Sequence, residues 1–382
     1  MKVEVHSFSE NYYSYNDSNE LPNANKVQIV LCFGAKHKII DPKIYPSIAA
    51  RYPNAAIALC STSGEIVNNA VLDDTISITA IEFEKTTVET ASVNIEDYGG
   101  NSFEAGIALV EQLNRDESLK YIMVLSDGSL VNGSDLVSGI NSLIKNQVPV
   151  TGGLAGDGTA FNSTAVGLNE CPVSGKIIAI GFYGNHLVVS HGTMGGWETF
   201  GPERTITRSK SNQLFEINHE NALDLYKKYL GNYVEQLPGS ALLFPLSVQL
   251  NPTSKPLVRT ILAIDNDEKS MTFAGNVPEG AKVRFMRANL DKIINAANDA
   301  AVNAFQFQPL STHKLALLVS CVGRKIILGN RLDEEVEAVF DAFQGKTQIT
   351  GFYSYGEISP FSAVEVCELH NQTMTITTFD EN

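Results

Sequence analysis

The stretch Val148-Pro149-Val150-Thr151-Gly152-Gly153-Leu154-Ala155-Gly156-Asp157-Gly158 carries the local signal around which the chain is organised. A β-branched run, which is typical of a strand, ends abruptly in a series of glycines that contains one carboxylate. Glycine permits positive φ angles and the close approach of another backbone or of a ligand. The pattern therefore fits either a plain tight turn or a turn with room for a ligand above it.

The same order of parts occurs three times. Residues 121–157 contain an apolar strand, a helix with apolar residues at helical spacing, and then the glycine stretch. Residues 315–357 repeat that order, and residues 27–66 form a third, weaker copy. Each copy predicts a strand–helix–strand unit with parallel strands and a right-handed connection.

These repeats predict the fold class and a pocket. Ligands gather outside the carboxyl ends of parallel strands, which is where the glycine-containing loops lie. Alternating polar and apolar residues elsewhere predict antiparallel hairpins. We expect an α/β fold with mixed sheets, built from repeated strand-helix-strand units plus antiparallel hairpins. We also expect two related domains, residues 27–218 and 219–365.

Composition narrows the class of protein. The chain has 382 residues, 43% of them hydrophobic and 19% charged, as expected for a soluble globular protein. A formal net charge of −15 argues against nucleic acid and anionic membranes as partners. The sequence shows no membrane-span-length apolar run and no signal-peptide core, so we expect a cytoplasmic protein. Five scattered cysteines and seven histidines have no metal-site spacing, so no metal is predicted.

Several motifs together resemble the FIST family of bacterial sensory domains, with its N-terminal and C-terminal halves. The residues that carry the resemblance run in order through nearly the whole chain: Cys60-Ser61-Thr62-Ser63-Gly64-Glu65-Ile66, Gly152-Gly153-Leu154-Ala155-Gly156-Asp157, His191-Gly192 before Trp197, Thr205-Ile206-Thr207, Asn221-Ala222-Leu223-Asp224-Leu225-Tyr226, Tyr229-Leu230-Gly231, Ser320-Cys321-Val322-Gly323-Arg324, and Gly351-Phe352-Tyr353-Ser354-Tyr355-Gly356-Glu357-Ile358.

The resemblance implies a sensory role in signal transduction. It suggests a signal-input module that binds a small ligand, such as an amino acid or a similar metabolite, and passes the signal to a separate partner. A branch of the family binds haem and senses nitric oxide through a partner histidine kinase, which is the alternative function.

The candidate ligand-binding residues come from the loops of the second and third units. We expect the loops 152–157 and 351–357 to face one another across the domain junction and to line a shared cavity. The candidates are Gly152, Gly153, Asp157, Ser320, Cys321, Arg324, Ser354, Tyr355 and Glu357.

Each charged candidate has two interpretations. Arg324 follows a strand end, where its guanidinium could clamp a ligand carboxylate or form an ion pair with Glu357 or a neighbouring acid. Asp157, Glu357 and Glu65 occupy corresponding loop positions in the three units. They could converge on a ligand amino group, or each could accept hydrogen bonds from its own turn.

Two further residue types bear on the alternatives. His191 precedes a glycine loop with Met194 and Trp197, where it could ligate haem iron or act as a structural histidine that fixes the loop. Cys321 could be a nucleophile, but no base lies nearby in sequence, which favours a buried inert thiol. Ser and Cys at strand ends lack a Gly-x-Ser-x-Gly elbow or a triad pattern. A binding module is therefore predicted rather than an enzyme.

Overall fold

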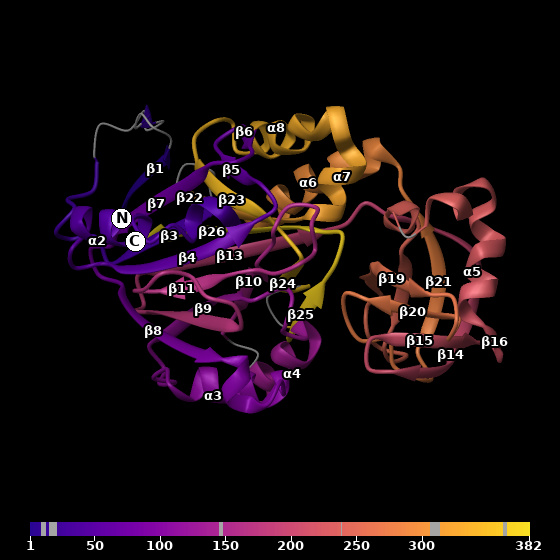
Figure 1. Ribbon diagram of the computed structural model, residues 1–382. Helices are drawn as coiled ribbons and strands as arrows, with labels where there is room; N and C mark the ends of the chain where they lie inside the picture. The colour runs from indigo at the N-terminus through magenta and orange to yellow at the C-terminus, as the bar shows by residue number, and fades with distance from the viewer. Residues whose placement is uncertain (9–12, 15–20, 145–147, 238, 306–313, 362–364) are drawn as a thin grey trace.

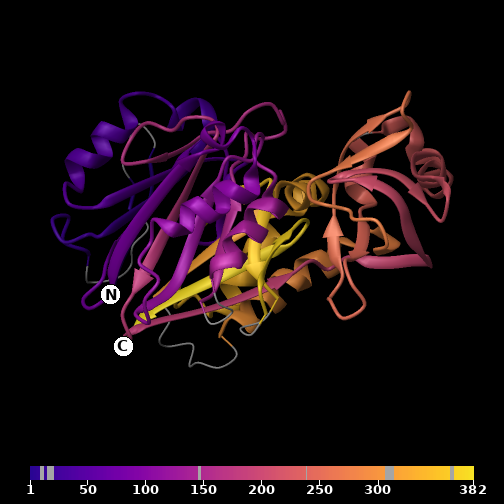
Figure 2. The same ribbon diagram turned by 90° about the horizontal axis from the view of Figure 1, so that it is seen from below.

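The chain forms an α/β body and a smaller β-rich lobe. The computed structural model describes residues 1–8, 13–14, 21–144, 148–237, 239–305, 314–361 and 365–382. Residues 198–287 make up the lobe, which stands beside the body in two perpendicular views (Figures 1 and 2). Both chain termini lie in the body, far from the lobe (Figure 1).

The three predicted strand–helix–strand units are confirmed, because in each one the strand after the helices runs parallel to the strand before them. The first unit consists of β3 (Ile29–Ala35), α1 (Lys36–Ile39), α2 (Ile44–Arg51) and β4 (Ala56–Thr62). The second consists of β9 (Leu119–Ser126), α4 (Gly133–Leu143) and β10 (Val150–Leu154). The third consists of β22 (Leu315–Cys321), α7 (Val322–Leu328), η4 (Gly329–Arg331), α8 (Leu332–Ala342) and β23 (Gln348–Ser354).

Each unit is the centre of one six-stranded mixed sheet, which confirms the predicted fold class. The first sheet has the order β11 (Val166–Leu168), β4, β3, β7 (Ile76–Glu82), β1 (Lys2–Phe8) and β2 (Tyr13–Ser14). The second has the order β25 (Cys367–His370), β24 (Gly356–Pro360), β10, β9, β12 (Lys176–Tyr183) and β8 (Thr87–Asn94). The third has the order β13 (Leu187–Met194), β26 (Met374–Glu381), β22, β23, β5 (Glu65–Val67) and β6 (Ala70–Leu72).

The three sheets exchange strands in a cycle. β5 follows the first unit along the chain but pairs with β23 of the third. β24 follows the third unit but pairs with β10 of the second. β11 follows the second unit but pairs with β4 of the first. The β5–β23 and β24–β10 pairs therefore join residues on either side of position 219, the expected domain boundary. The ends of the three units meet at one place in the body.

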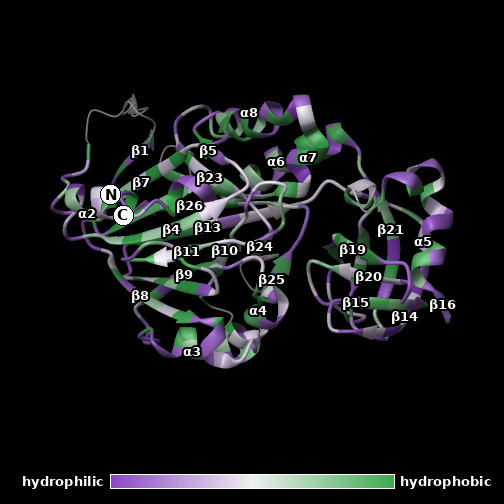
Figure 3. Cartoon of the chain, viewed as in Figure 1, coloured by the Kyte–Doolittle hydropathy of each residue, from purple (hydrophilic) through white to green (hydrophobic). Residues whose placement is uncertain are grey.

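One core joins the three sheets. It contains side chains from every unit, among them Phe33, Tyr121, Phe352 and Phe379. The rings of Phe33 and Phe352, which belong to the first and third units, stack with their centroids 4.6 Å apart. In Figure 3 the central strands are mostly coloured as hydrophobic. Such extensive burial holds the units in a fixed arrangement.

The outer layers of the body are helical. The helices α3 (Ser102–Glu111) and α4 cover the second sheet. The short helix η1 (Ile95–Tyr98) precedes α3 in the chain. The helix α6 (Leu290–Phe305) packs with α8 against the third sheet. Six of the alanine and isoleucine side chains of α6 are buried, which is possible because small residues allow the helix to approach the sheet closely.

The lobe has its own core around α5 (Ala222–Leu230). Its sheet has the order β18 (Leu257–Arg259), β17 (Leu246–Gln249), β21 (Lys282–Arg287), β14 (Glu198–Lys210), β15 (Gln213–Ile217), β20 (Ser270–Phe273) and β19 (Ile261–Asp265), and β16 (Glu220–Asn221) pairs with β15. Two short helices, η2 (Gly231–Gln236) and η3 (Gly239–Leu243), connect α5 to β17.

Candidate functional site

The loops that follow the three units meet through a ring of backbone hydrogen bonds. The Ser63 N–H donates to the Tyr353 carbonyl at 2.8 Å, and the Tyr355 N–H donates to the Leu154 carbonyl at 3.1 Å. The Gly156 N–H completes the cycle by donating to the Ser61 carbonyl at 2.9 Å. The ring makes Ser63, Tyr355 and Gly156 equivalent positions of the three units. It also brings the predicted loops 152–157 and 351–357 side by side.

The two glycines at the centre of the opening motif lie inside a strand instead of in a loop. Gly152 and Gly153 are buried in β10, which pairs with β9 on one side and β24 on the other. Gly152 has a φ of +151°, and a Cβ atom there would overlap the backbone carbonyl oxygen of Val124. Glycine is therefore needed at 152 for the approach of two neighbouring strands.

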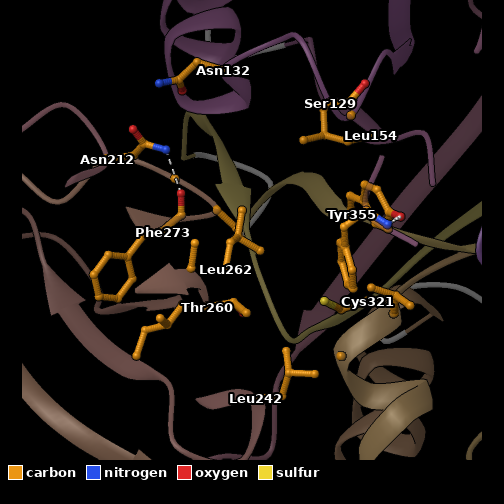
Figure 4. A pocket seen from close by; sticks show the side chains of 18 of the residues that line it. Ser129, Asn132, Leu154, Asn212, Leu242, Thr260, Leu262, Phe273, Cys321 and Tyr355 are labelled. Atoms are coloured by element: carbon orange, nitrogen blue, oxygen red, sulfur yellow. Dashed lines mark hydrogen bonds between the residues drawn. The ribbon is translucent and has the colours of Figure 1, made fainter. Parts of the chain in front are cut away.

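A cavity of about 590 Å³ lies where the body faces the lobe. In Figure 4, Thr260, Leu262 and Phe273 of the lobe stand on one side, and Cys321 and Tyr355 of the body stand on the other. The lining residues are Gly128, Ser129, Val131, Asn132, Leu154, Phe161, Asn162, Asn212, Gly239, Leu242, Thr260, Ile261, Leu262, Ala263, Phe273, Ala274, Gly275, Cys321, Val322, Gly323 and Tyr355. A space of this size suits a small organic ligand.

Tyr355 and Asp157, two of the predicted site residues, are joined at the edge of this cavity. The Tyr355 hydroxyl donates to the Asp157 carboxylate, which also accepts the Asn162 and Ser163 N–H groups at 3.0 Å each. Burial opposes ionisation of Asp157, but these hydrogen bonds outweigh it and lower the pKa of the carboxyl. The Phe161 ring stacks on Tyr355 with centroids 4.8 Å apart. Asp157 thus fixes the loop that carries an aromatic wall of the cavity.

The three acids that the sequence placed at corresponding positions do not correspond. The backbone ring aligns Glu65 with Glu357, whereas the matching position of the second unit is Gly158. Glu65 accepts from the hydroxyls of Thr62 and Thr75, at 2.5 and 2.6 Å.

Glu357 makes the matching set of contacts. It accepts from the hydroxyls of Ser354 and Thr373, at 2.8 and 2.9 Å. Both glutamates are fully buried, and burial raises the pKa of Glu65 to about 7 and that of Glu357 to about 8. Each glutamate therefore accepts hydrogen bonds from residues around its own turn, which was the second of the two interpretations of the sequence.

Arg324 forms a buried ion pair, but its partner is Glu335 of α8 instead of Glu357. Its Nε and Nη2 both lie 2.7 Å from Glu335 Oε2. The guanidinium also donates to the carbonyls of Gly195 and Ile293, at 2.7 and 2.8 Å. Arg324 and Glu335 are each 0% exposed, and Arg324 does not line the cavity. The guanidinium instead ties α7 to α6 and α8.

The remaining polar candidates are also engaged in the interior. The Ser320 hydroxyl donates to Glu335 at 3.0 Å, and the Ser354 hydroxyl contacts Glu357 and the Ser320 carbonyl. Cys321 lines the cavity, but burial raises the pKa of its thiol, which disfavours the nucleophilic thiolate. The structure therefore brings Cys321, Tyr355 and, through Tyr355, Asp157 to the cavity.

His191 lies elsewhere, at a second cavity of about 900 Å³. This cavity is also lined by Met194, Trp197, Met286 and Phe361. The His191 Nε2 atom is buried and has no hydrogen-bond partner among the described residues. Burial lowers the pKa of His191, so the imidazole is held neutral.

Sequence reasoning missed the lobe side of the first cavity. No local motif marks Thr260, Leu262 and Phe273, and none of them belongs to the repeated units. Within the described ranges, no group of three His, Cys, Asp or Glu side chains is placed so that it could hold a metal ion. None of the described helices is long and apolar enough to cross a membrane.

Comparison with known protein families gives a match over most of the chain. Residues 28–220 match the FIST N domain and residues 222–360 match the FIST C domain. No curated protein sequence matches the chain. Among solved structures, a cyanuric acid hydrolase from A. caulinodans has 6% identity and a TM-score of 0.39, covering 100% of this chain and 99% of that one. A second cyanuric acid hydrolase structure has 8% identity and a TM-score of 0.38, with the same coverage. These scores are too low to support an argument about function.

Proposed function

Because this chain belongs to the FIST family, we propose that it is a cytoplasmic signal-input protein that binds a small metabolite in the 590 Å³ cavity. FIST domains are small-ligand sensory domains of signalling proteins. The signal passes to a separate partner protein, and a histidine kinase is the partner class that the family resemblance implies.

The observation that carries this proposal is the origin of the lining residues. Thr260 and Leu262 come from the lobe, whereas Cys321 and Tyr355 come from the body. A ligand that contacts both parts stabilises one arrangement of lobe and body over others. Ligand binding can thereby shift the population of conformations that a partner recognises.

A thermal-shift screen tests the proposal. The library contains the amino acids, which the family resemblance implies, together with uncharged metabolites. A ligand of the cavity raises the melting temperature of the wild type, because binding to the native state alone stabilises it. The site is checked with Ala263→Trp, which fills the cavity from an exposed position on β19.

Glu268→Trp is the matched control, since residue 268 is exposed in the same hairpin and does not line the cavity. Wild type and Glu268→Trp respond to the ligand, and Ala263→Trp does not. A library without a stabilising compound, or stabilisation that persists in Ala263→Trp, refutes the proposal.

His191 supports a second candidate function, a haem-binding sensor of nitric oxide. Its Nε2 atom is buried without a partner among the described residues and lies at a cavity with mostly apolar lining. An imidazole in such a place could serve as a ligand of haem iron. Bound haem would supply an iron centre for a diatomic gas. His191 would hold the iron, and Met194, Trp197 and Phe361 would pack the ring.

Haem titration followed by absorption spectroscopy tests this second function. We expect the wild type to shift and sharpen the Soret band of the added haem. His186→Gln, which alters an exposed histidine, should do the same, and His191→Gln should leave the band as in free haem. Identical spectra of free haem and of haem mixed with the wild type would refute it.

Three side chains at strand ends bear on the enzyme alternative. Ser320 and Ser354 are fully buried and donate to carboxylates, and neither lines the 590 Å³ cavity. Cys321 reaches that cavity with a thiol whose pKa is raised by burial.

A further inference from the structure

The cavity between body and lobe is lined without formal charge. Among its described lining residues there is no Asp, Glu, Lys, Arg or His. This is unusual for a protein whose net charge is −15, since acidic side chains are abundant on it. A binding site for a zwitterion or a carboxylate needs opposite charges or several converging donors, because an unpaired charge is costly to bury.

Two charged side chains near the lining make their hydrogen bonds with other parts of the protein. Asp127 accepts from Ser129 and Leu130 N–H groups at 2.7 Å each and from the Gly175 N–H at 3.0 Å. The Arg259 guanidinium is 1% exposed and donates to the Leu369 carbonyl at 2.9 Å and to the Asn276 carbonyl at 3.0 Å. Neither group lines the cavity, so neither supplies a counter-ion for a ligand.

The lining offers a large apolar surface instead. Leu262 and Phe161 are 46% and 45% exposed, which is unusual for such side chains when they lie together at one cavity. Phe161 has a φ of +50°, a conformation that a bulky residue rarely adopts. Its N–H donates to the Tyr355 hydroxyl at 3.1 Å, and this contact helps to hold the exposed ring against Tyr355. Strained residues of this kind cluster at ligand sites.

One buried polar atom of the lining is left unsatisfied. The side chain of Thr260 is on the cavity wall and the residue is only 3% exposed. Its Oγ1 atom has no hydrogen-bond partner among the described residues. A buried hydroxyl without a partner is destabilising, and a ligand that supplies the missing hydrogen bond relieves that cost.

We propose that the ligand of this cavity is an uncharged molecule with an apolar body and one amide, carbonyl or hydroxyl group that pairs with Thr260. The apolar body packs between Leu262 and Phe273 of the lobe and the aromatic wall of Phe161 and Tyr355. An amino acid, with two charges, is disfavoured at this site. This inference rests on the proposed function, since it names the class of ligand that the sensory cavity accepts.

Matched triads of small molecules test the charge preference. Each triad joins one scaffold (phenyl, 2-naphthyl, 3-indolyl or hexyl) to a carboxamide, a carboxylate or an aminomethyl group. Dissociation constants are measured by calorimetry with the full chain, and binding to the cavity is verified with Ala263→Trp and Glu268→Trp. For the scaffolds that bind, we expect the carboxamide to bind at least about tenfold more tightly than both charged members, because only they leave a charge unpaired.

The variant Thr260→Val tests the hydrogen bond with little change of shape. We expect its affinity for the best carboxamide to fall about three- to tenfold, as is typical for one neutral hydrogen bond. Its melting temperature without ligand does not fall, because the lost hydroxyl had no partner. Thr272→Val, on β20 but outside the cavity lining, is the control and retains full affinity.

The outcomes separate this inference from the proposed function. Cavity binding that favours the carboxylate or the aminomethyl member overturns the inference and leaves the proposed function standing. An unchanged carboxamide affinity in Thr260→Val overturns the role of Thr260. If no triad member binds and no compound in the thermal-shift screen binds, the proposed function itself falls.

Discussion

Replacement of Arg324 by methionine should destabilise the folded protein without acting through ligand contact. The substitution removes a guanidinium that is fully buried. Among the described residues, the Glu335 carboxylate then keeps the hydroxyls of Ser320 and Tyr353 as hydrogen-bond donors. Breaking a buried ion pair by removing one partner costs about 3–5 kcal/mol, because the other charge stays buried. The carbonyls of Gly195 and Ile293 each lose one donor as well. The free energy of unfolding should therefore fall by at least about 3 kcal/mol.

Urea denaturation followed by circular dichroism measures this loss, and two further variants establish its cause. The double variant Arg324→Met/Glu335→Leu should recover a large part of it, since an apolar pair leaves no charge unpaired. Arg331→Met is the control, because Arg331 pairs with Glu334 on the surface of the same segment, and its unfolding midpoint should stay unchanged. A stable Arg324→Met protein that has lost ligand affinity would refute this reasoning and restore Arg324 as a ligand contact.

Two further predictions concern the body. Glu357→Gln should make stability less dependent on pH: burial raises the pKa of Glu357 from 4.5 to about 8, so its favourable contribution is complete below pH 4.5 and is lost as pH rises through 8. The variant should therefore gain stability relative to wild type between pH 5 and 9, on the order of a few kcal/mol, and equal pH profiles of unfolding midpoints would contradict this. Gly152→Ala should lose at least about 3 kcal/mol, because its Cβ overlaps the Val124 carbonyl, while Gly158→Ala, with φ +74° and open space around it, should lose about 1 kcal/mol. Equal melting temperatures of the two alanine variants would show that the strand approach at 152 tolerates a side chain.

The three strand–helix–strand units could be predicted because their signals are local. An apolar strand, an amphipathic helix and a β-branched strand ending in glycine each follow from the periodicity of side chains along the chain. Parallel pairing of β9 with β10 and of β22 with β23 then follows from the length of the connection. The equivalence of the three acids could not be judged this way, because a shift of one position in a loop leaves no periodic trace.

The sequence by itself determined the fold class, the three units and the meeting of the loops at 152–157 and 351–357. Tertiary structure alone decided the partner of Arg324. Both Glu335 and Glu357 follow Arg324 in the third unit and its loop, and the sequence does not show which of the two carboxylates the guanidinium reaches. It also decided the composition of the cavity. Thr260 of the lobe and Tyr355 of the body both line it, although they are 95 positions apart in the sequence. The hydrophobic effect depends on how much apolar surface leaves water and hardly on which segment covers that surface. A local pattern therefore predicts that a face is buried, but it does not predict which distant segment packs against that face. The site forms where body and lobe meet, and that contact is fixed by packing over the whole chain.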